Sequence, residues 1–197
     1  MRITVFGASG RTGRHVIDHG LSRGHELTAF VRDAARFTVS DDRLEIVEGD
    51  ARDPASVEAA VAGRDGVISV LALARAEDEP QYSDATRVIV EAMRGSGVLR
   101  IVVTANNDVF GDDEVTGEFA AHAREHRRNR ENLRASGLDW TIGAARSVVD
   151  KPATGAYRFE LDAKAPGRKI TTADYATFAL DALDQQQWIG HIVGASN

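Results

Sequence analysis

The segment Gly7–Gly13, GASGRTG, constrains the fold most, because it stands between an apolar run and a helical pattern. Residues 3–6 are typical of a buried strand, and residues 11–23 are typical of a helix. At such a junction the first glycine permits a tight turn, the second lets the backbone approach a pyrophosphate, and the third brings helix and sheet together. The helix N-terminus then offers N–H groups and a positive dipole end to phosphates. The motif therefore predicts a dinucleotide-binding unit, with Ser9, Arg11 and Thr12 as additional donors.

The alternation of short apolar runs with helical patterns continues along the chain. The runs are rich in Val and Ile and apolar almost throughout, as strands buried on both faces are. Strands that alternate with helices predict a parallel sheet. We therefore expect an α/β fold with a Rossmann-like doubly wound parallel sheet. The expected strands are 3–6, 27–31, 44–47, 67–71, 101–103 and 140–142, and the expected helices are 11–23, 54–62, 83–96 and 118–136.

The pattern changes after residue 142. Residues 154–159 predict an added strand or hairpin, residues 172–183 a helix capped by Thr171 or Thr172, and residues 191–193 a last strand. The sequence shows no internal repeat and no linker. We expect a single domain over 1–197, in which residues 143–197 contribute most of the substrate pocket.

Composition limits the chemistry. The chain of 197 residues has no cysteine, which excludes disulfides, thiolate catalysis and iron–sulfur clusters. Redox chemistry therefore requires a bound cofactor. A net charge of −6 argues against nucleic acid or an anionic membrane as a partner. We expect a cytoplasmic protein with a small-molecule substrate, as a monomer or small homo-oligomer, because no leader or membrane-spanning run is visible.

The end of the second expected strand indicates which dinucleotide binds. Enzymes that prefer NAD place Asp or Glu there, bonded to the ribose 2′-hydroxyl. Here Arg32 occupies that position and Arg36 follows one helical turn later. Guanidinium groups suit a 2′-phosphate, so we expect NADP(H). The alternative is that Arg32 is a solvated residue paired with Asp33.

Several stretches resemble a known family. They are GASGRTG, FVRDAAR (30–36), VEGDARD (47–53), VAGRDGVISVL (61–71), LRASGLDWT (133–141) and TGAY (154–157). The chain resembles the atypical short-chain dehydrogenase/reductases, NmrA-like NAD(P)H-binding proteins, and particularly their flavin-reductase branch. The resemblance implies NADPH across the carboxyl ends of the strands. By position, it implies cofactor contacts at Gly7, Ser9, Gly10, Arg11, Thr12, Gly13, Arg32, Arg36, Asp50, Ala51, Leu71, Ala72, Leu73 and Thr104, with Ala105 near the nicotinamide.

The chain departs from the family where the chemistry takes place. Ordinary short-chain reductases use a Tyr-x-x-x-Lys pair, but no tyrosine here has a lysine four positions on. In flavin-reductase-like members a serine ends the fifth strand and a histidine follows the sixth. Asn106 and Ser147 stand at those positions, and Ala145-Arg146 replaces the usual proline pair.

These departures give the candidate catalytic residues Asn106, Arg146 and Ser147. Asn106 could donate a hydrogen bond to a carbonyl that gains negative charge. Asp108 could act as a general acid or base, although an Asn/Asp-rich turn with local backbone bonds is the simpler interpretation. Arg146 could bind an acidic substrate or pair with Asp150. Tyr157 could supply a phenol, or pack its ring.

A further pattern, His122-Ala123-Arg124-Glu125-His126, matches the H-x-x-E-H arrangement of some zinc peptidases. The chain continues Arg127-Arg128-Asn129-Arg130, which favours a solvated helix face with surface ion pairs. We expect no metal site.

Three functions remain open from the sequence. The first is an NADPH-dependent oxidoreductase that transfers a hydride to a small planar or carbonyl-bearing acceptor, such as a flavin or quinone. The second is a non-redox isomerase, dehydratase or cyclase on an NADP-binding scaffold. The third is an NADP(H)-sensing regulatory protein without catalysis. The rebuilt rather than lost pocket segment favours the reductase.

Overall fold

One mostly parallel sheet forms the centre of the computed structural model, which describes residues 1–72, 81–111, 116–117 and 120–197. Its strand order is β3-β2-β1-β4-β5-β6-β10-β8, and only β8 runs antiparallel to its neighbour. The first six strands in this order follow the Rossmann pattern, which confirms the doubly wound fold. The strands are β1 Arg2–Phe6, β2 Glu26–Val31, β3 Leu44–Glu48, β4 Gly66–Ser69, β5 Arg100–Asn106, β6 Asp139–Ala145, β8 Arg158–Leu161 and β10 His191–Ser196.

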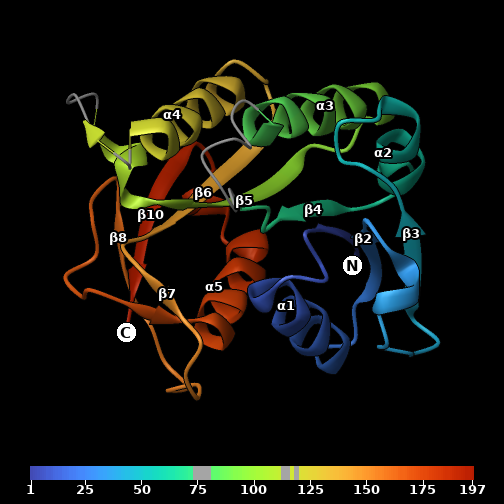
Figure 1. Cartoon of the computed structure of the whole chain (residues 1–197), viewed down its shortest axis with the longest axis horizontal. Helices are drawn as coiled ribbons and strands as arrows, with labels where there is room; N and C mark the ends of the chain where they lie inside the picture. Colours follow the sequence, from blue (N-terminus) through green and yellow to red (C-terminus); the bar gives the residue numbers. More distant parts are fainter. Residues whose placement is uncertain (73–80, 112–115, 118–119) are drawn as a thin grey trace.

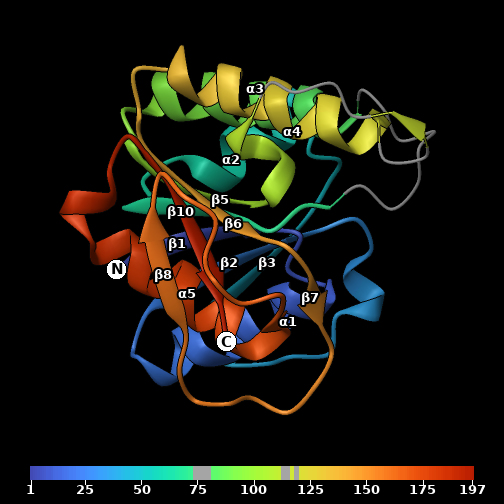
Figure 2. The same cartoon turned by 90° about the vertical axis from the view of Figure 1, so that its left-hand side faces the viewer.

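Helices cover both faces of this sheet. Helices α1 (Arg11–Ser22) and α5 (Thr172–Asp184) lie on one face, and α2 (Pro54–Val61), α3 (Gln81–Ser96) and α4 (Ala120–Arg134) lie on the other (Figure 1 and Figure 2). Helices α1, α2, α3 and α5 pack apolar residues against the buried strands, as a three-layer α/β architecture requires, whereas α4 contributes only Leu133 to the apolar clusters. No helix in the described part of the chain combines the length and apolar character that crossing a bilayer demands.

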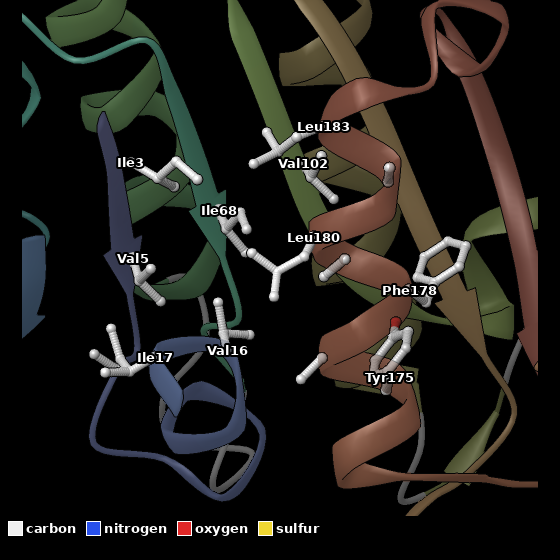
Figure 3. Packing of buried hydrophobic residues seen from close by; sticks show 14 of the residues in the cluster. Ile3, Val5, Val16, Ile17, Ile68, Val102, Tyr175, Phe178, Leu180 and Leu183 are labelled. Atoms are coloured by element: carbon white, nitrogen blue, oxygen red, sulfur yellow. The ribbon is translucent and has the colours of Figure 1, made fainter. Parts of the chain in front are cut away.

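The core beneath α1 and α5 buries one face of the strands, and helices cover the other face as well. The strand sequences are therefore apolar almost throughout. Leu180 of α5 projects toward Ile68 of β4, and Val16 of α1 closes the same layer (Figure 3). These three side chains are almost completely buried. Burial of one such aliphatic side chain stabilises the fold by about 1.5–3 kcal/mol.

Local sequence signals set several helix boundaries. Asp53 caps α2 by accepting a hydrogen bond from the Ser56 N–H at 3.1 Å, and Pro54 follows at the first helical position. Thr171 caps α5. Gly97 and Gly137 have φ of +71°, the left-handed conformation that commonly follows the last turn of a helix.

The segment after β6 differs in part from its expectation. The strand predicted at 154–159 begins only at Arg158, because Asp174 holds residues 154 and 155 in a loop through the Thr154 and Gly155 N–H groups. Two short strands, β7 (Val148–Val149) and β9 (Ile170–Thr171), pair with each other and were not predicted. The structure also contains the short 3-10 helices η1 (Ala34–Arg36), η3 (Asn107–Phe110) and η5 (Gln186–Trp188).

Candidate functional site

A pocket of about 300 Å³ opens where β1, β2, β3 and β4 end. Ligands of doubly wound folds bind in this position, beyond the carboxyl ends of the strands. Most of the lining comes from the predicted cofactor residues. The lining residues are Gly7, Ser9, Gly10, Phe30, Val31, Arg32, Gly49, Asp50, Ala51, Arg52, Val70, Leu71, Ala72, Tyr82 and Ala85.

The three glycines of the opening motif differ in the space around them, and a Cβ atom is excluded at Gly7 and Gly13. Gly7 has φ of +81°, and a Cβ atom on it would lie 2.9 Å from the Val70 carbonyl oxygen. A Cβ on Gly13 would collide with the Gly7 carbonyl oxygen, so this glycine lets α1 pack close to the turn. A Cβ on Gly10 would meet only the Gly7 oxygen within 4 Å. The backbone of Gly7 and Gly10, which we call the glycine cradle, thus faces the pocket with open space beside Gly10.

The N-terminus of α1 borders the same cradle. Gly10 is its N-cap, and no side chain caps the helix. The first N–H groups of a helix have no partner within the helix, so here they remain for an anion. By contrast, side chains cap α2 and α5. The glycine geometry and the uncapped helix together fit the pyrophosphate of a dinucleotide.

The pocket lining also contains two arginines, Arg32 and Arg52. Arg32 follows β2 and makes no ion pair among the described residues, whereas the Asp33 carboxylate pairs with Arg36 at 3.3 Å. The suggested pairing of Arg32 with Asp33 is therefore not formed. Arg52 pairs with Asp50 at 2.6 Å, and this hydrogen-bonded pair lowers the pKa of the Asp50 carboxyl.

Some predicted cofactor residues lie off the lining of this pocket. Arg11, Thr12 and Gly13 belong to the first turn of α1, and Arg36 lies on η1 with its side chain 86% exposed. Thr104 is buried in β5, where its carbonyl oxygen accepts a hydrogen bond from the Tyr82 hydroxyl. Leu73 lies outside the described residues.

Seven lining residues were not predicted as cofactor contacts, and two of them carry polar side chains, Arg52 and Tyr82. The other five are Phe30, Val31, Gly49, Val70 and Ala85. Arg52 lies in the stretch VEGDARD (47–53), which carries part of the family resemblance. Its place two residues after Asp50 could have indicated that it contacts the cofactor. Tyr82 reaches the pocket because α3 starts beside the end of β4, which the sequence alone does not reveal. Its hydroxyl donates to the Thr104 carbonyl oxygen at 2.7 Å. Burial raises the pKa of this phenol, and the neighbouring Asn129 opposes that only in part.

The candidate catalytic residues gather at the ends of β5 and β6. Asn106 pairs in register with Ala145, the residue before Arg146. The Asn106 Oδ1 accepts a hydrogen bond from the Asp108 N–H, and its Nδ2 donates to the Asp108 carboxylate, both at 2.9 Å. Asn106 thus caps η3, as the local-turn interpretation expects, and one proton of its amide remains for another acceptor.

Arg146 and Ser147 both lie exposed just after β6. Arg146 makes no ion pair with Asp150 or any other described residue. The Ser147 carbonyl oxygen accepts from the Ile170 N–H at 2.9 Å, which ties this segment to β9. Both side chains are therefore exposed at the edge where an acceptor would approach.

Tyr157 does not contribute a phenol to this edge. Its ring packs against Phe178, and its hydroxyl donates to the Asp181 carboxylate at 2.6 Å. Burial raises the pKa of this phenol, and the bond to Asp181 raises it further.

A larger hollow of about 600 Å³ lies between α3 and α4. Charged side chains of these helices line it, away from the glycine loop.

The α4 segment that was expected to be a solvated face is partly buried. His126, Asn129 and Arg130 are all more than nine-tenths buried, and Glu125 is completely buried. Arg130 turns inward because its guanidinium donates to the Val109 carbonyl oxygen of η3 at 3.0 Å. Glu125 accepts from the Ser83 N–H in the first turn of α3 at 2.9 Å. The alternation of charges thus reflects contacts with neighbouring elements rather than solvent alone.

Comparisons with known proteins agree with this geometry. A family model described as NAD(P)H-binding matches residues 7–186. An uncharacterized protein of Bacillus subtilis (strain 168), YwnB, is 25% identical over 95% of this chain and 94% of its own length. The (4-alkanoyl-5-oxo-2,5-dihydrofuran-3-yl)methyl phosphate reductase of Streptomyces griseus is 29% identical over 75% of this chain and 48% of that protein. An uncharacterized Mycobacterium tuberculosis protein is 35% identical, but the match spans only 12% of its length.

Solved structures share the whole fold. A short-chain dehydrogenase/reductase from Veillonella parvula, determined in complex with NADP, superposes with a TM-score of 0.84 at 18% identity, covering 100% of this chain and 94% of that one. A Streptococcus pneumoniae protein described as a proposed NADH-flavin reductase superposes with a TM-score of 0.83 at 21% identity, covering 99% and 98%.

Proposed function

Because the chain belongs to the NAD(P)H-binding family, whose model matches residues 7–186, we propose that it is an NADPH-dependent reductase acting on a small planar or carbonyl-bearing acceptor, such as a flavin or quinone. The observation that carries this proposal is the pocket with its open glycine cradle, its uncapped helix α1 and its cationic Arg32. The reductase names among the relatives support the same chemistry. A bound reduced nicotinamide would supply the hydride, since the chain has no redox-active thiol of its own.

The chain's own residues divide the work of binding. The N–H groups at the start of α1 hold the pyrophosphate, and Ser9 adds a hydroxyl donor. Leu71 and Ala72, just beyond β4, lie along the ribose and nicotinamide part of the cofactor. Arg32 binds the 2′-phosphate, and this contact favours NADPH over NADH.

The edge formed by β5 and β6 holds the acceptor. Asn106 donates its remaining amide proton to an acceptor carbonyl, where negative charge develops during reduction. Arg146 is the cation free to attract an acidic substituent on the acceptor, since no described carboxylate pairs with it. Residues 143–197, as part of a single domain, provide most of the surrounding wall.

The test is oxidation of NADPH by the purified protein, followed by the loss of nicotinamide absorbance with FMN or a simple quinone added. We expect protein-dependent oxidation that is faster with NADPH than with NADH. Gly10→Val fills the cradle and is expected to abolish both NADPH binding and oxidation. Gly95→Val is the matched control, because a Cβ at position 95 meets nothing within 4 Å. A wild-type preparation that binds NADPH in a calorimetric titration but oxidises none of it would contradict the reductase.

A further inference from the structure

Helix α4 turns a polar face toward the interior, beside the end of β5. His122, His126 and Asn129 recur at helical spacing on this face, and η3, which packs against α4, adds Asn107. Each of these side chains has a buried polar atom without a hydrogen-bond partner among the described residues. The atoms are Nδ1 of His122, Nδ1 of His126, both amide atoms of Asn129 and Oδ1 of Asn107. We call these four side chains the α4 polar cluster. The Asn129 amide lies close enough to the Tyr82 hydroxyl to lower the pKa of that phenol, but the hydroxyl donates its proton to Thr104 and the pair does not reach hydrogen-bond geometry.

Buried polar atoms of this kind need a hydrogen-bond partner. A buried polar group that forms no hydrogen bond costs about 1–3 kcal/mol, so native proteins place ordered water beside such groups. Across residues 1–72, 81–111, 116–117 and 120–197, no three His, Asp or Glu side chains gather closely enough to hold a metal ion. The mixture of imidazole and amide groups, each able to donate and accept, suits water.

The α4 polar cluster lies beside one residue of the pocket and beside the turn that follows β5. His122 is half-buried, whereas His126 is only 8% exposed. The His126 ring meets the edge of Tyr82, which lines the pocket, with ring centroids 5.3 Å apart. On its other side the charge of Asp108, which is bonded to Asn106, acts on His126.

The hydroxyl groups of the buried tyrosines near these strand ends already donate hydrogen bonds to backbone carbonyl oxygens. The Tyr82 hydroxyl donates to Thr104, and the Tyr175 hydroxyl lies 2.5 Å from the Gly143 carbonyl oxygen. Burial raises the pKa of both phenols. His126 differs, since burial lowers the pKa of its ring to about 4 and Asp108 opposes this only in part. At neutral pH its imidazole therefore carries one N–H donor and one free lone pair.

We propose that His126, with water held by the α4 polar cluster, relays the proton that the acceptor needs. The inference rests on the proposed reductase function. Reduction of a quinone or carbonyl adds a hydride, with its electron pair, and one proton. The acceptor takes the hydride from the reduced dinucleotide, and its oxygen takes a proton from a water molecule held by the cluster. One ring nitrogen of His126 returns a proton to this water, and a second water molecule protonates the other ring nitrogen. The imidazole stays neutral, and bulk solvent neutralises the hydroxide that remains.

The kinetic test compares two acceptors with different proton demand. A quinone needs a hydride and a proton, whereas the N-methylacridinium cation needs a hydride alone. We expect His126→Phe, which keeps a ring but removes both nitrogens, to slow quinone reduction about 100-fold and acridinium reduction less than about threefold. His191→Phe is the matched control, because His191 lies at the start of β10 and pairs with Asp162. The uncatalysed reaction of acridinium with NADPH is subtracted.

A second variant separates loss of the proton path from loss of packing. His126→Gly leaves a ring-sized space, and added imidazole is expected to restore quinone reduction at least about tenfold toward wild type. Calorimetric NADPH affinity and the melting temperature of each variant show whether the fold and the cofactor pocket survive. Equal slowing with both acceptors, or no slowing with either, would overturn the relay while leaving the reductase intact.

A measurement without turnover tests the same idea. In ¹⁵N histidine spectra of the cofactor-free protein, the His126 ring should stay neutral from pH 8 to about pH 5 and should show magnetisation transfer from water. The charged and titratable groups that face it are Asp108 from η3, Tyr82 from α3 and His122 from its own helix. A ring protonated at pH 7, or one without contact to water, would contradict the relay. Wild-type protein that oxidises no NADPH would instead remove the proposed function itself.

Discussion

The cofactor side and the acceptor side of the sheet's carboxyl edge differ in how many of their polar groups form hydrogen bonds within the protein. On the cofactor side, the start of α1 has no side-chain cap, and Arg32 makes no ion pair among the described residues. On the acceptor side, Asn106 and Asp108 bond each other, and Tyr175 bonds backbone oxygens. The cofactor side is thus preformed to receive an anion. The acceptor side is a folded turn whose hydrogen bonds are largely made, so under the proposed function acceptor selectivity depends on exposed groups such as Arg146.

The largest effect is expected at Gly13, whose replacement tests whether the cofactor side is rigid. A Cβ there would collide with the Gly7 carbonyl oxygen and lie 2.8 Å from the Ala8 Cα, both of which are backbone atoms that yield little. We expect Gly13→Ala to lower the free energy of unfolding by about 3 kcal/mol and to abolish NADPH binding. Urea unfolding and calorimetry measure the two effects.

Gly95→Ala provides the matched control for this substitution. It lies in α3 with open space around the added Cβ, and replacing a helical glycine there should raise the free energy of unfolding by about 0.5–1 kcal/mol. If Gly13→Ala were as well tolerated as Gly95→Ala, the cradle would not be the rigid element described above.

The next largest effect is expected at Arg32. Arg32→Asp should weaken NADPH binding about 10- to 100-fold, because a charge-assisted hydrogen bond to a phosphate contributes about 1.5–3 kcal/mol. NADH binding should be nearly unchanged. Arg36→Asp should have a smaller effect, since Arg36 is highly exposed and paired with Asp33. Equal losses for both nucleotides in calorimetric titrations would show that Arg32 does not select NADPH.

Asn106 and Asp53 sharpen the comparison, because both cap a helical segment but only Asn106 lies at the acceptor edge. Asn106→Ala and Asp53→Ala should each lower the free energy of unfolding by about 1 kcal/mol. Only Asn106→Ala should also slow quinone reduction, by at least about tenfold, with NADPH affinity preserved. A parallel loss of turnover in both variants would assign Asn106 a purely structural role.

The smallest effect concerns acid stability on the acceptor side. Burial alone would raise the pKa of Asp174, but hydrogen bonds from Thr154, Thr171 and Gly155 outweigh it and hold the pKa below its ordinary value of 3.8. Stabilisation by the ionised carboxylate is therefore present at neutral pH and disappears as the pH falls through the lowered pKa.

Asp174→Asn tests this dependence. We expect it to lower the free energy of unfolding by about 1 kcal/mol at pH 7, and the difference from wild type should shrink below pH 3.8. Urea unfolding midpoints at pH 7 and pH 3 provide the comparison, with the exposed Asp150→Asn as control. A difference that grew on acidification would contradict the sign of the shift.

The fold was predictable from the sequence because its signals are local. Apolar runs, the Asp53-Pro54 start of α2 and the glycines after α3 and α4 each specify backbone conformation within a few residues. The two-residue strands β7 and β9 have no such signal, because each is a strand only through pairing with the other.

The site was predictable to the extent that backbone builds it. The glycine loop, Asp50 and Leu71 follow directly from strand ends, and the structure brings them together in one pocket. Tyr82 reaches that pocket from the start of a distant helix, and Arg130 becomes buried because a carbonyl group of η3 accepts its proton. Such tertiary contacts produce no periodic pattern of apolar residues in the sequence. The burial of polar α4 side chains was therefore not predictable.

The small ladder between β7 and β9 has a consequence for how such a protein diversifies. Residues 150–157 form a loop that is anchored by β7 at one end and by β8 at the other, and Asn197 fastens it through hydrogen bonds to Thr154 and Ala156. Doubling the length of such a loop costs only about 0.6 kcal/mol of closure entropy. Insertions or exchanges between these anchors reshape the surroundings of the acceptor edge while the glycine loop stays untouched. Under the proposed function, the acceptor preference can therefore change through this loop while the cofactor pocket stays as it is.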